Sequence, residues 1–350
     1  MSDIAQRTPD AVGSPPGKSG GDGFGSILSR TGWGFLKQRE ASVVVIALIL
    51  IVYFAVTTTG FDTHGSIVNI AQFMASYTIL AIGLVFLMVA GEIDLSSCYV
   101  WTFSPFVMHF FYDSGLPIVP AIIVTIVVLA LVVGLINGVV VTVFGVPSLI
   151  ATIGTGWIIY GYMLTVSHAQ QINLPAVSPT VNKWFGAGNW SEFIWATVLT
   201  VIFAVIFTRT RWGIYTISVG DNLLGSREAG IKVKAVKISG FVLSAGCGAL
   251  AGILEAFRND IIDPSAGQLS VVLIALAGVV IGGTAMTGGS GTVIGAWLGV
   301  LVLGILSDGF NLRGISANTF LIIQGAALVI MMIINNQLVR LRTLGRLGAK

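Results

Sequence analysis

Two acidic residues interrupt a part of the chain that is otherwise strongly apolar. Glu92 and Asp94 lie in the sequence Gly-Glu-Ile-Asp-Leu-Ser at 91–96, between two long segments without charge. A carboxylate within a bilayer is costly, which makes each acid a candidate site for a proton or a cation. At a cytoplasmic turn, where water reaches it, Asp94 would instead cap the next helix through its side-chain oxygen. Both interpretations stay open, and we favour the structural or gating one.

A second interruption is uncharged. The segment 282–291 is rich in glycine and breaks the helix between two further apolar segments. Each of the two interruptions, 91–96 and 282–291, comes directly after an apolar segment, and this similarity resembles a weak internal repeat. Broken helices at corresponding positions of two halves indicate a transport pathway. The gating or helix-break residues that we predict are Glu92, Asp94, Ser96, Gly282, Gly283, Thr284, Gly288 and Gly289.

Polar side chains recur along one face of a predicted helix. Asn69, Gln72 and Ser76 are three or four residues apart, with Phe73 beside them, and this spacing places them on one side of an α-helix. Because polar groups are costly against lipid, the face should turn inward, toward a partner helix or a water-filled path. The predicted substrate pathway comprises Asn69, Gln72, Phe73, Ser76, Asn137, Thr152 and Thr155. The set is uncharged, which favours a neutral polar solute.

The loop 209–237 carries a cluster of basic residues and a short capped sequence. Asp221 can cap a helix that Gly230 ends, with three apolar side chains on roughly one side. The preference of Lys and Arg for cytoplasmic loops explains the charge but not the capped turn. A short helix with an apolar stripe is suited to docking against a partner subunit. The predicted docking residues are Asp221, Asn222, Leu223, Leu224, Arg227, Glu228, Gly230 and Ile231.

Membrane-spanning helices are needed to position these residues. Hydrophobic residues make up 55% of the 350, and charged residues 9%, against roughly a quarter in soluble domains. A helix needs about 20 apolar residues to cross a bilayer, and the uncharged runs accommodate ten. We predict an all-α polytopic membrane protein with spans at about 41–57, 67–90, 96–112, 118–143, 148–166, 191–208, 237–256, 269–283, 291–307 and 318–335.

The basic residues orient these spans. With both termini cytoplasmic, 15 of the 18 Lys and Arg residues lie inside, as the positive-inside rule requires. The predicted domains are a flexible tail at 1–40, a transmembrane domain at 41–338 and a basic tail at 339–350. The longest external segment is 167–190, for which we predict an ordered or partly ordered surface loop.

Other chemistries are excluded by spacing. The segment 13–19 has three residues between its glycines, two of them proline, whereas a phosphate-binding loop has four. The cysteines, Cys98 and Cys247, lack metal-ligand neighbours and are predicted to pack in the core. No catalytic residue, metal site or nucleic-acid surface is predicted. Small residues four apart, as in Gly240-Ser244-Gly248-Gly252, predict close helix packing.

The chain resembles the permease subunits of bacterial ABC importers of the ribose, xylose, arabinose and galactose type, over roughly 41–340. The resemblance rests on Ile93–Ser96, on Gly134–Gly138 with Val146–Gly154, on Gly220–Lys237 and on Gly282–Thr284 with Gly288–Thr292. Glu92, Ser97, Cys98, Leu224–Ser226 and Ser290 depart from the usual residues of the family.

The resemblance implies transport of a monosaccharide, a pentose or a related polyol, by alternating access across the bacterial cytoplasmic membrane. It also implies a second permease, identical or paralogous, a cytoplasmic ATPase that binds ATP and Mg²⁺, and an extracytoplasmic sugar-binding protein. The chain itself would hold no cofactor. The alternatives are an ABC permease for nucleosides or branched-chain amino acids, and an ion-coupled transporter that uses Glu92 or Asp94.

Overall fold

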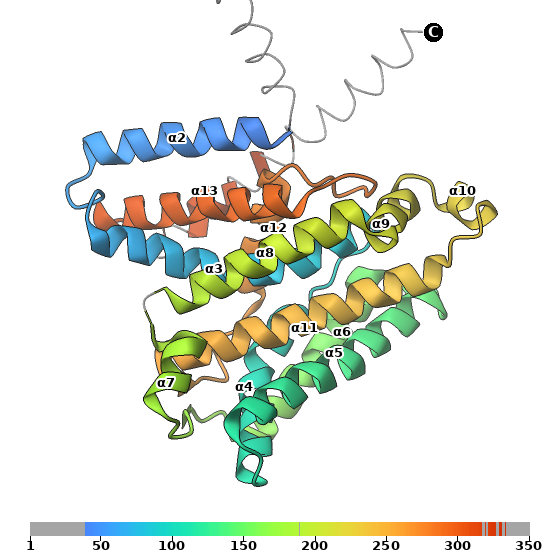
Figure 1. Cartoon of the computed structure of the whole chain (residues 1–350), viewed down its shortest axis with the longest axis horizontal. Helices are drawn as coiled ribbons and strands as arrows, with labels where there is room; N and C mark the ends of the chain where they lie inside the picture. Colours follow the sequence, from blue (N-terminus) through green and yellow to red (C-terminus); the bar gives the residue numbers. More distant parts are fainter. Residues whose placement is uncertain are drawn as a thin grey trace, which may run out of the picture. The chain divides into compact units, whose positions relative to one another are not determined.

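The computed structural model describes residues 39–188, 190–316, 319, 321–326, 329–330 and 333. These residues form an almost entirely helical bundle (Figure 1). The helices are α2 (Arg39–Thr57), α3 (His64–Val89), α4 (Ser97–Asp113), α5 (Ile118–Thr142), α6 (Ser148–Ser167), α7 (Pro179–Asn182), the π-helix η1 (Lys183–Ala187), α8 (Ser191–Arg209), α9 (Arg211–Asp221), α10 (Leu223–Glu228), α11 (Val233–Asn259), α12 (Leu269–Ile281) and α13 (Val293–Leu312).

Seven of the described helices are long and apolar enough to cross a membrane. They are α2, α3, α5, α6, α8, α11 and α13, and they confirm the all-α polytopic class. Two more predicted spans coincide with α4 and α12, which have only 17 and 13 residues. The tenth, 318–335, lies largely outside the described residues, as do both predicted tails. The count of ten and the cytoplasmic termini stay predictions.

The two ends of the bundle carry different short helices. Figure 1 shows α10 at one end, called here the α10 end, and α7 at the other, called the α7 end. The long helices α3, α5, α8 and α11 run between them. The predicted orientation makes the α10 end cytoplasmic.

Glycine ladders bring α11 against its neighbours. A Cβ atom on Gly248 would lie 2.7 Å from the carbonyl oxygen of Ser97, and one on Gly252 would lie 1.8 Å from that of Trp101. Gly134 of α5 meets the backbone of Val242 in the same way. The predicted packing role of these small residues is therefore confirmed, and it supplies the close approach that lipid does not drive.

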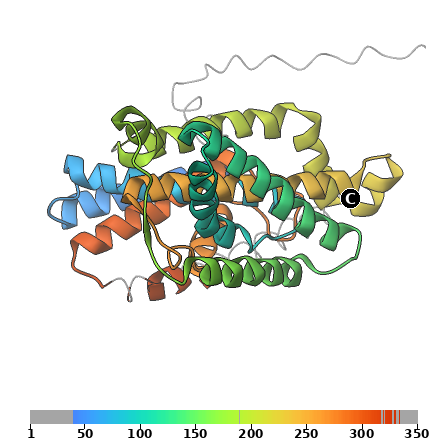
Figure 2. The ribbon, with the colours of Figure 1, turned by 90° about the horizontal axis from the view of Figure 1, so that it is seen from below.

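Helix α4 packs against α11 and contains a proline. Figure 2, which views the ribbon from below, shows α4 in front of the long helices. Pro105 has no N–H to donate to the carbonyl of Trp101. The Ser104 hydroxyl lies 3.2 Å from that oxygen and 2.8 Å from the carbonyl oxygen of Ala249 on α11. The serine thus helps to satisfy the freed acceptor and links the two helices.

Two connections between the long helices contain regular structure. The segment 167–190, predicted as an ordered or partly ordered surface loop, contains α7, η1 and the strand β1 (Ile172–Asn173), which pairs antiparallel with β2 (Ile261–Ile262), Ile172 opposite Ile262. In the loop 209–237, helix α9 occupies most of the first half and was not predicted from the sequence. Helix α11 begins at Val233, four residues before the predicted start of its span.

Candidate functional site

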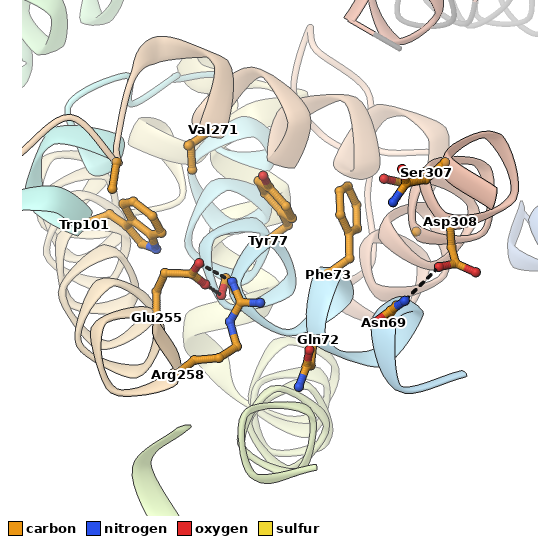
Figure 3. Close-up of a pocket in the computed structure, with 14 residues that line it drawn as sticks. Asn69, Gln72, Phe73, Tyr77, Trp101, Glu255, Arg258, Val271, Ser307 and Asp308 are labelled. Carbon is orange, nitrogen blue, oxygen red and sulfur yellow. Dashed lines mark hydrogen bonds and ion pairs between the residues drawn. The ribbon is translucent and has the colours of Figure 1, made fainter. Parts of the chain in front are cut away.

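A polar cavity of about 440 Å³ lies between α3, α11, α12 and α13. Figure 3 shows side chains of α3 and α11 directed into it, with charged and aromatic groups side by side. Its lining residues are Asn69, Gln72, Phe73, Ser76, Tyr77, Trp101, Glu255, Arg258, Ala266, Val271, Gly304, Ser307, Asp308 and Asn311. A cavity of this size suits a small molecule.

Four predicted pathway residues meet in this cavity. Asn69, Gln72, Phe73 and Ser76 all line it from one face of α3. Helix α3 can present polar groups there because its α10-end half, from Ile79 to Val89, is completely buried in apolar contacts. The N-cap Thr63 accepts a hydrogen bond from the amide of Ser66 at 3.3 Å and defines where the helix begins.

An ionic network lies on one side of the cavity. Arg258 of α11 contacts Glu192 of α8, with Nε 3.2 Å from Oε2, and also pairs with Glu255 one turn before it. Glu255 accepts a hydrogen bond from Ser76 at 2.7 Å. Glu192 is only 2% exposed, so the pairing with Arg258 is what compensates its burial. The network joins α3, α8 and α11.

A third carboxylate, that of Asp308, lies across the cavity from the network (Figure 3). Asp308 of α13 accepts hydrogen bonds from the Ser66 hydroxyl and from the Asn69 amide, the latter at 3.3 Å. Asp308 is 6% exposed. The carboxylate therefore ties α13 to the polar face of α3.

Aromatic rings complete the lining. The rings of Phe73 and Tyr77 lie 4.7 Å apart, centre to centre, and Trp101 of α4 is a third aromatic at the cavity wall. Such rings present a flat surface with a partly negative face. Flat apolar surfaces beside carboxylate and amide groups allow the cavity to contact both the carbon skeleton and the hydroxyl groups of a polar solute.

A strand-to-helix connection closes the cavity near α4. Gly267 approaches the first turns of α4 so closely that a Cβ atom would lie 2.5 Å from the carbonyl oxygen of Cys98. Before it, Asp263 accepts hydrogen bonds from the amide and hydroxyl of Ser265 at 2.8 and 2.7 Å. Partial burial opposes ionisation, but these hydrogen bonds hold the pKa of Asp263 below its ordinary value.

The remaining predicted pathway residues lie elsewhere. Asn137 donates to the Ser96 hydroxyl at 2.8 Å, and the amide of Leu95 donates to Thr152 at 3.1 Å. Both side chains are completely buried. Thr155 lies one turn further along α6 and is half-buried. Asn137 and Thr152 thus secure the break at 91–96 and do not line the cavity.

Asp94 is completely buried, which contradicts the expectation that water reaches it. Its carboxylate accepts hydrogen bonds from the amide and hydroxyl of Ser96, at 2.8 and 2.6 Å. The N-cap of α4 is Ser96, and Asp94 orders the turn before it instead of capping the helix. The chain turns back into the bundle after Gly91 and carries Asp94 inward with it.

Glycines form a backbone junction where three predicted segments meet. Gly91, Gly220 and Gly289 come from the first break, from α9 and from the second break. The amide of Gly289 donates to the carbonyl of Val89 at 2.8 Å, and a Cβ atom on Gly220 would lie 1.7 Å from the same oxygen. Gly288 and Gly289 have φ of +88° and +76°, which favour glycine. The other break residues, Gly282, Gly283 and Thr284, follow directly on α12.

An ion pair lies beside the junction. Lys237 Nζ of α11 lies 2.5 Å from Glu92 Oε1, and both side chains are largely buried. The charge of Glu92 is therefore paired with that of a lysine side chain in the same chain.

The segment predicted to dock a partner lies at the α10 end and differs in detail from the prediction. Asn222 caps α10, accepting from the amide of Gly225 at 2.9 Å, whereas Asp221 is the last residue of α9. The prediction of Asp221 as the N-cap is wrong, because the extended residue that precedes α10 is Asn222, one position later. Gly230, at φ +78°, follows the end of α10 as predicted.

The apolar residues of this segment do not share one environment. Leu224 is 69% exposed and Leu223 36% exposed, whereas Ile231 packs against the small apolar cluster of Val219, Val233 and Val236. Arg227 and Glu228 are exposed on α10. Leu224 is thus the most exposed apolar side chain of α10.

Sequence reasoning missed the charged half of the cavity. Glu192, Glu255, Arg258 and Asp308 lie near the ends of apolar runs, where charges are usually interpreted as span boundaries. The spacing of Glu255 and Arg258 on one helical turn was the available signal. The expectation of an uncharged pathway therefore does not describe this cavity.

Comparison with known proteins places the chain in a family. The model described as "Branched-chain amino acid transport system / permease component" matches residues 66–332, and the chain belongs to this family of membrane permease subunits. The match covers every residue of the cavity and of the junction. The resemblance to ABC importer permeases is confirmed.

Individual relatives agree with this class. The chain is 34% identical to the xylose/arabinose import permease protein XylH of Sulfolobus acidocaldarius, over 86% of this chain and 85% of the relative. It is 28% identical to the ribose import permease protein RbsC of Escherichia coli K12, over 87% and 95%. The autoinducer 2 import system permease protein LsrC of Salmonella typhi is 30% identical over 76% and 77%. No solved structure matches the chain.

Proposed function

We propose that the chain is the permease through which a partner ATPase drives a monosaccharide, a pentose or related polyol, into the cell by alternating access. The observation that carries this proposal is the cavity, in which carboxylate, amide and hydroxyl groups lie beside Phe73, Tyr77 and Trp101. Polar groups of this kind can bond several hydroxyls, while the rings contact the C–H faces of a sugar. The names of the relatives, import permeases for xylose/arabinose, ribose and autoinducer 2, point the same way.

The position of the cavity fits import. In the predicted orientation the α10 end is cytoplasmic, so the cavity lies toward the outer side, where a sugar-binding protein would deliver its ligand. Such a protein, a second permease copy or paralogue and the bacterial cytoplasmic membrane are parts of the proposal. The lining groups then hold the sugar until the helices reorient.

The ATPase would act through α10. Leu224 projects from this short helix. Gly220, at the end of α9 that adjoins α10, contacts Val89 of α3 and Gly289 of the second break. A displacement of α10 would therefore reach the junction directly, because only two residues separate Gly220 from the start of α10. Coupling requires that the ATPase and the sugar favour different conformations of the permease. ATP and Mg²⁺ would bind to the ATPase alone.

Reconstitution tests the proposal. Proteoliposomes that contain the chain, its ATPase and its binding protein should accumulate labelled xylose or ribose only with ATP inside, and a protonophore should have no effect. Leu224→Ser should uncouple sugar-stimulated ATP hydrolysis, whereas Leu312→Ser, at the opposite end, should not. Concentrative uptake by the chain alone, or uptake that a protonophore abolishes, would refute the proposal.

A further inference from the structure

A groove with a different chemistry lies at the α7 end, between η1 and the first turns of α8. It has a volume of about 760 Å³. Its lining residues are Pro179, Thr180, Lys183, Trp184, Gly188, Trp190, Ser191, Ile194, Trp195 and Val198. The lining contains three tryptophans and one charged residue, Lys183, and the substrate cavity shares none of these residues.

The groove is preformed by the backbone of η1. The Trp195 indole N–H donates to the carbonyl of Trp184 at 3.0 Å, and the rings of Trp195 and Phe185 stack at 6.1 Å. A Cβ atom on Gly186 would lie 2.5 Å from the carbonyl oxygen of Leu254, so η1 is seated directly on α11. These contacts hold the rim, while Trp184 remains 62% exposed.

The groove continues along the bilayer-facing side of α8. Ser191 and Val198 are separated by about 10 Å along the helix. Ile194 and Val198 are 50% and 46% exposed, and the apolar surface extends past the groove to Val201 and Val205. A soluble protein that docks on the outer surface would not reach this depth, whereas an acyl chain lies along such a surface.

The charge at the rim complements a phosphate. Lys183 is exposed and lines the groove with the tryptophans, and the acid nearest to it in the sequence, Glu192, is paired with Arg258. Tryptophan is enriched at the level of lipid headgroups, and basic residues at that level attract anionic lipids. We propose that this groove binds one anionic phospholipid, with its phosphate on Lys183 and an acyl chain along Ile194 and Val198.

Native mass spectrometry of the full chain, released from detergent with phosphatidylglycerol or phosphatidylcholine, tests the site. Lys183→Gln should weaken retention of phosphatidylglycerol about fivefold, and the matched charge change Lys234→Gln, at the α10 end, should not. Val198→Trp should displace the lipid by filling the groove. Ile158→Trp, at an exposed position of α6 that does not line the groove, should leave retention unchanged.

Several outcomes would overturn the assignment. Equal retention in all four variants would show that the lipid binds elsewhere. Equal loss of both lipids in Lys183→Gln would contradict a preference for anionic headgroups, and competition by inorganic phosphate would show that the headgroup binds without the tail. Occupation of the groove by a second permease copy or by the binding protein in the assembled importer, with lipid absent, would also refute it. Thermal stability of each variant in detergent controls for misfolding.

Discussion

The substrate cavity and the glycine junction are built in opposite ways. The cavity is made of side chains, with the ionic network of Glu192, Glu255 and Arg258 as its most polar part. At the junction, glycines leave no side chain between the segments, and backbone atoms of Val89, Gly220 and Gly289 are in direct contact. One region is suited to recognising a solute, and the other is suited to transmitting small displacements between backbones.

This difference predicts different tolerance to substitution. In the cavity, a conservative change removes one interaction and leaves room for water or another group. At the junction, even one added methyl group meets backbone atoms that belong to other segments. The following variants test the contrast.

Gly220→Ala should have the largest effect. Its methyl group would lie 1.7 Å from the carbonyl oxygen of Val89 and 2.5 Å from the amide nitrogen of Gly289. Overpacking of this kind costs about 1–3 kcal/mol or more, and ATP-dependent uptake should fall at least about tenfold. Gly161→Ala, where no atom lies within 4 Å, should transport normally. Equal uptake by the two variants in proteoliposomes would show that the junction is not tightly constrained.

Arg258→Met should be the next most damaging change, because it leaves Glu192 and Glu255 without their cation. Breaking a buried pair on one side costs about 3–5 kcal/mol, and the 27% exposure of Arg258 places the expected loss at or below the lower value. The double variant Glu192→Leu with Arg258→Met should regain part of the stability. A thermal-unfolding double-mutant cycle in detergent measures this coupling, and additive losses would argue against the pairing.

Gln72→Leu should affect recognition while leaving the fold intact. Loss of one hydrogen bond to a sugar hydroxyl costs about 1 kcal/mol, or roughly a fivefold rise in KM for uptake. The same substitution at Gln170, which is exposed at the surface, is the control and should leave KM unchanged. If both variants transport like the unmodified chain, Gln72 does not contact the sugar.

Asn222→Ala should have the smallest effect, confined to α10. Loss of an N-cap costs about 1 kcal/mol, so amide hydrogens of Gly225–Glu228 should exchange about fivefold faster. Asp221→Ala, beside it, should not change their exchange. The opposite ranking of the two variants would restore Asp221 as the cap.

Much of the fold could be predicted from the sequence, because apolar length and charge position are direct consequences of the bilayer. The spans at 118–143 and 191–208 match α5 and α8 within a residue or so. The Asn69–Ser76 face was predictable from helical spacing. The spans at 96–112 and 269–283 also match α4 and α12 within two residues. Composition does not show that these two helices are buried within the bundle, because a helix that begins inside the bundle has the same apolar composition as one that crosses the membrane.

The site was predicted less completely. Asn137 and Thr152 are polar and buried, as expected, but periodicity does not indicate which buried group a side chain contacts. The charged half of the cavity depends on tertiary pairing between Glu192 of α8 and Arg258 of α11. Residues 66 apart in the chain carry no local signal of such a pair.

The shortness of α12 has a consequence for how the protein is made. Its 13 residues extend over about 20 Å, less than the roughly 30 Å hydrocarbon core of a bilayer. A segment of this length is a poor independent substrate for the insertion machinery. Because α12 packs closely on α13 through Gly278 and Gly299, we expect the two helices to enter the membrane together as a hairpin. Helix α12 would then insert only after α13 has been synthesised. A truncated chain that ends after α12 should therefore be degraded.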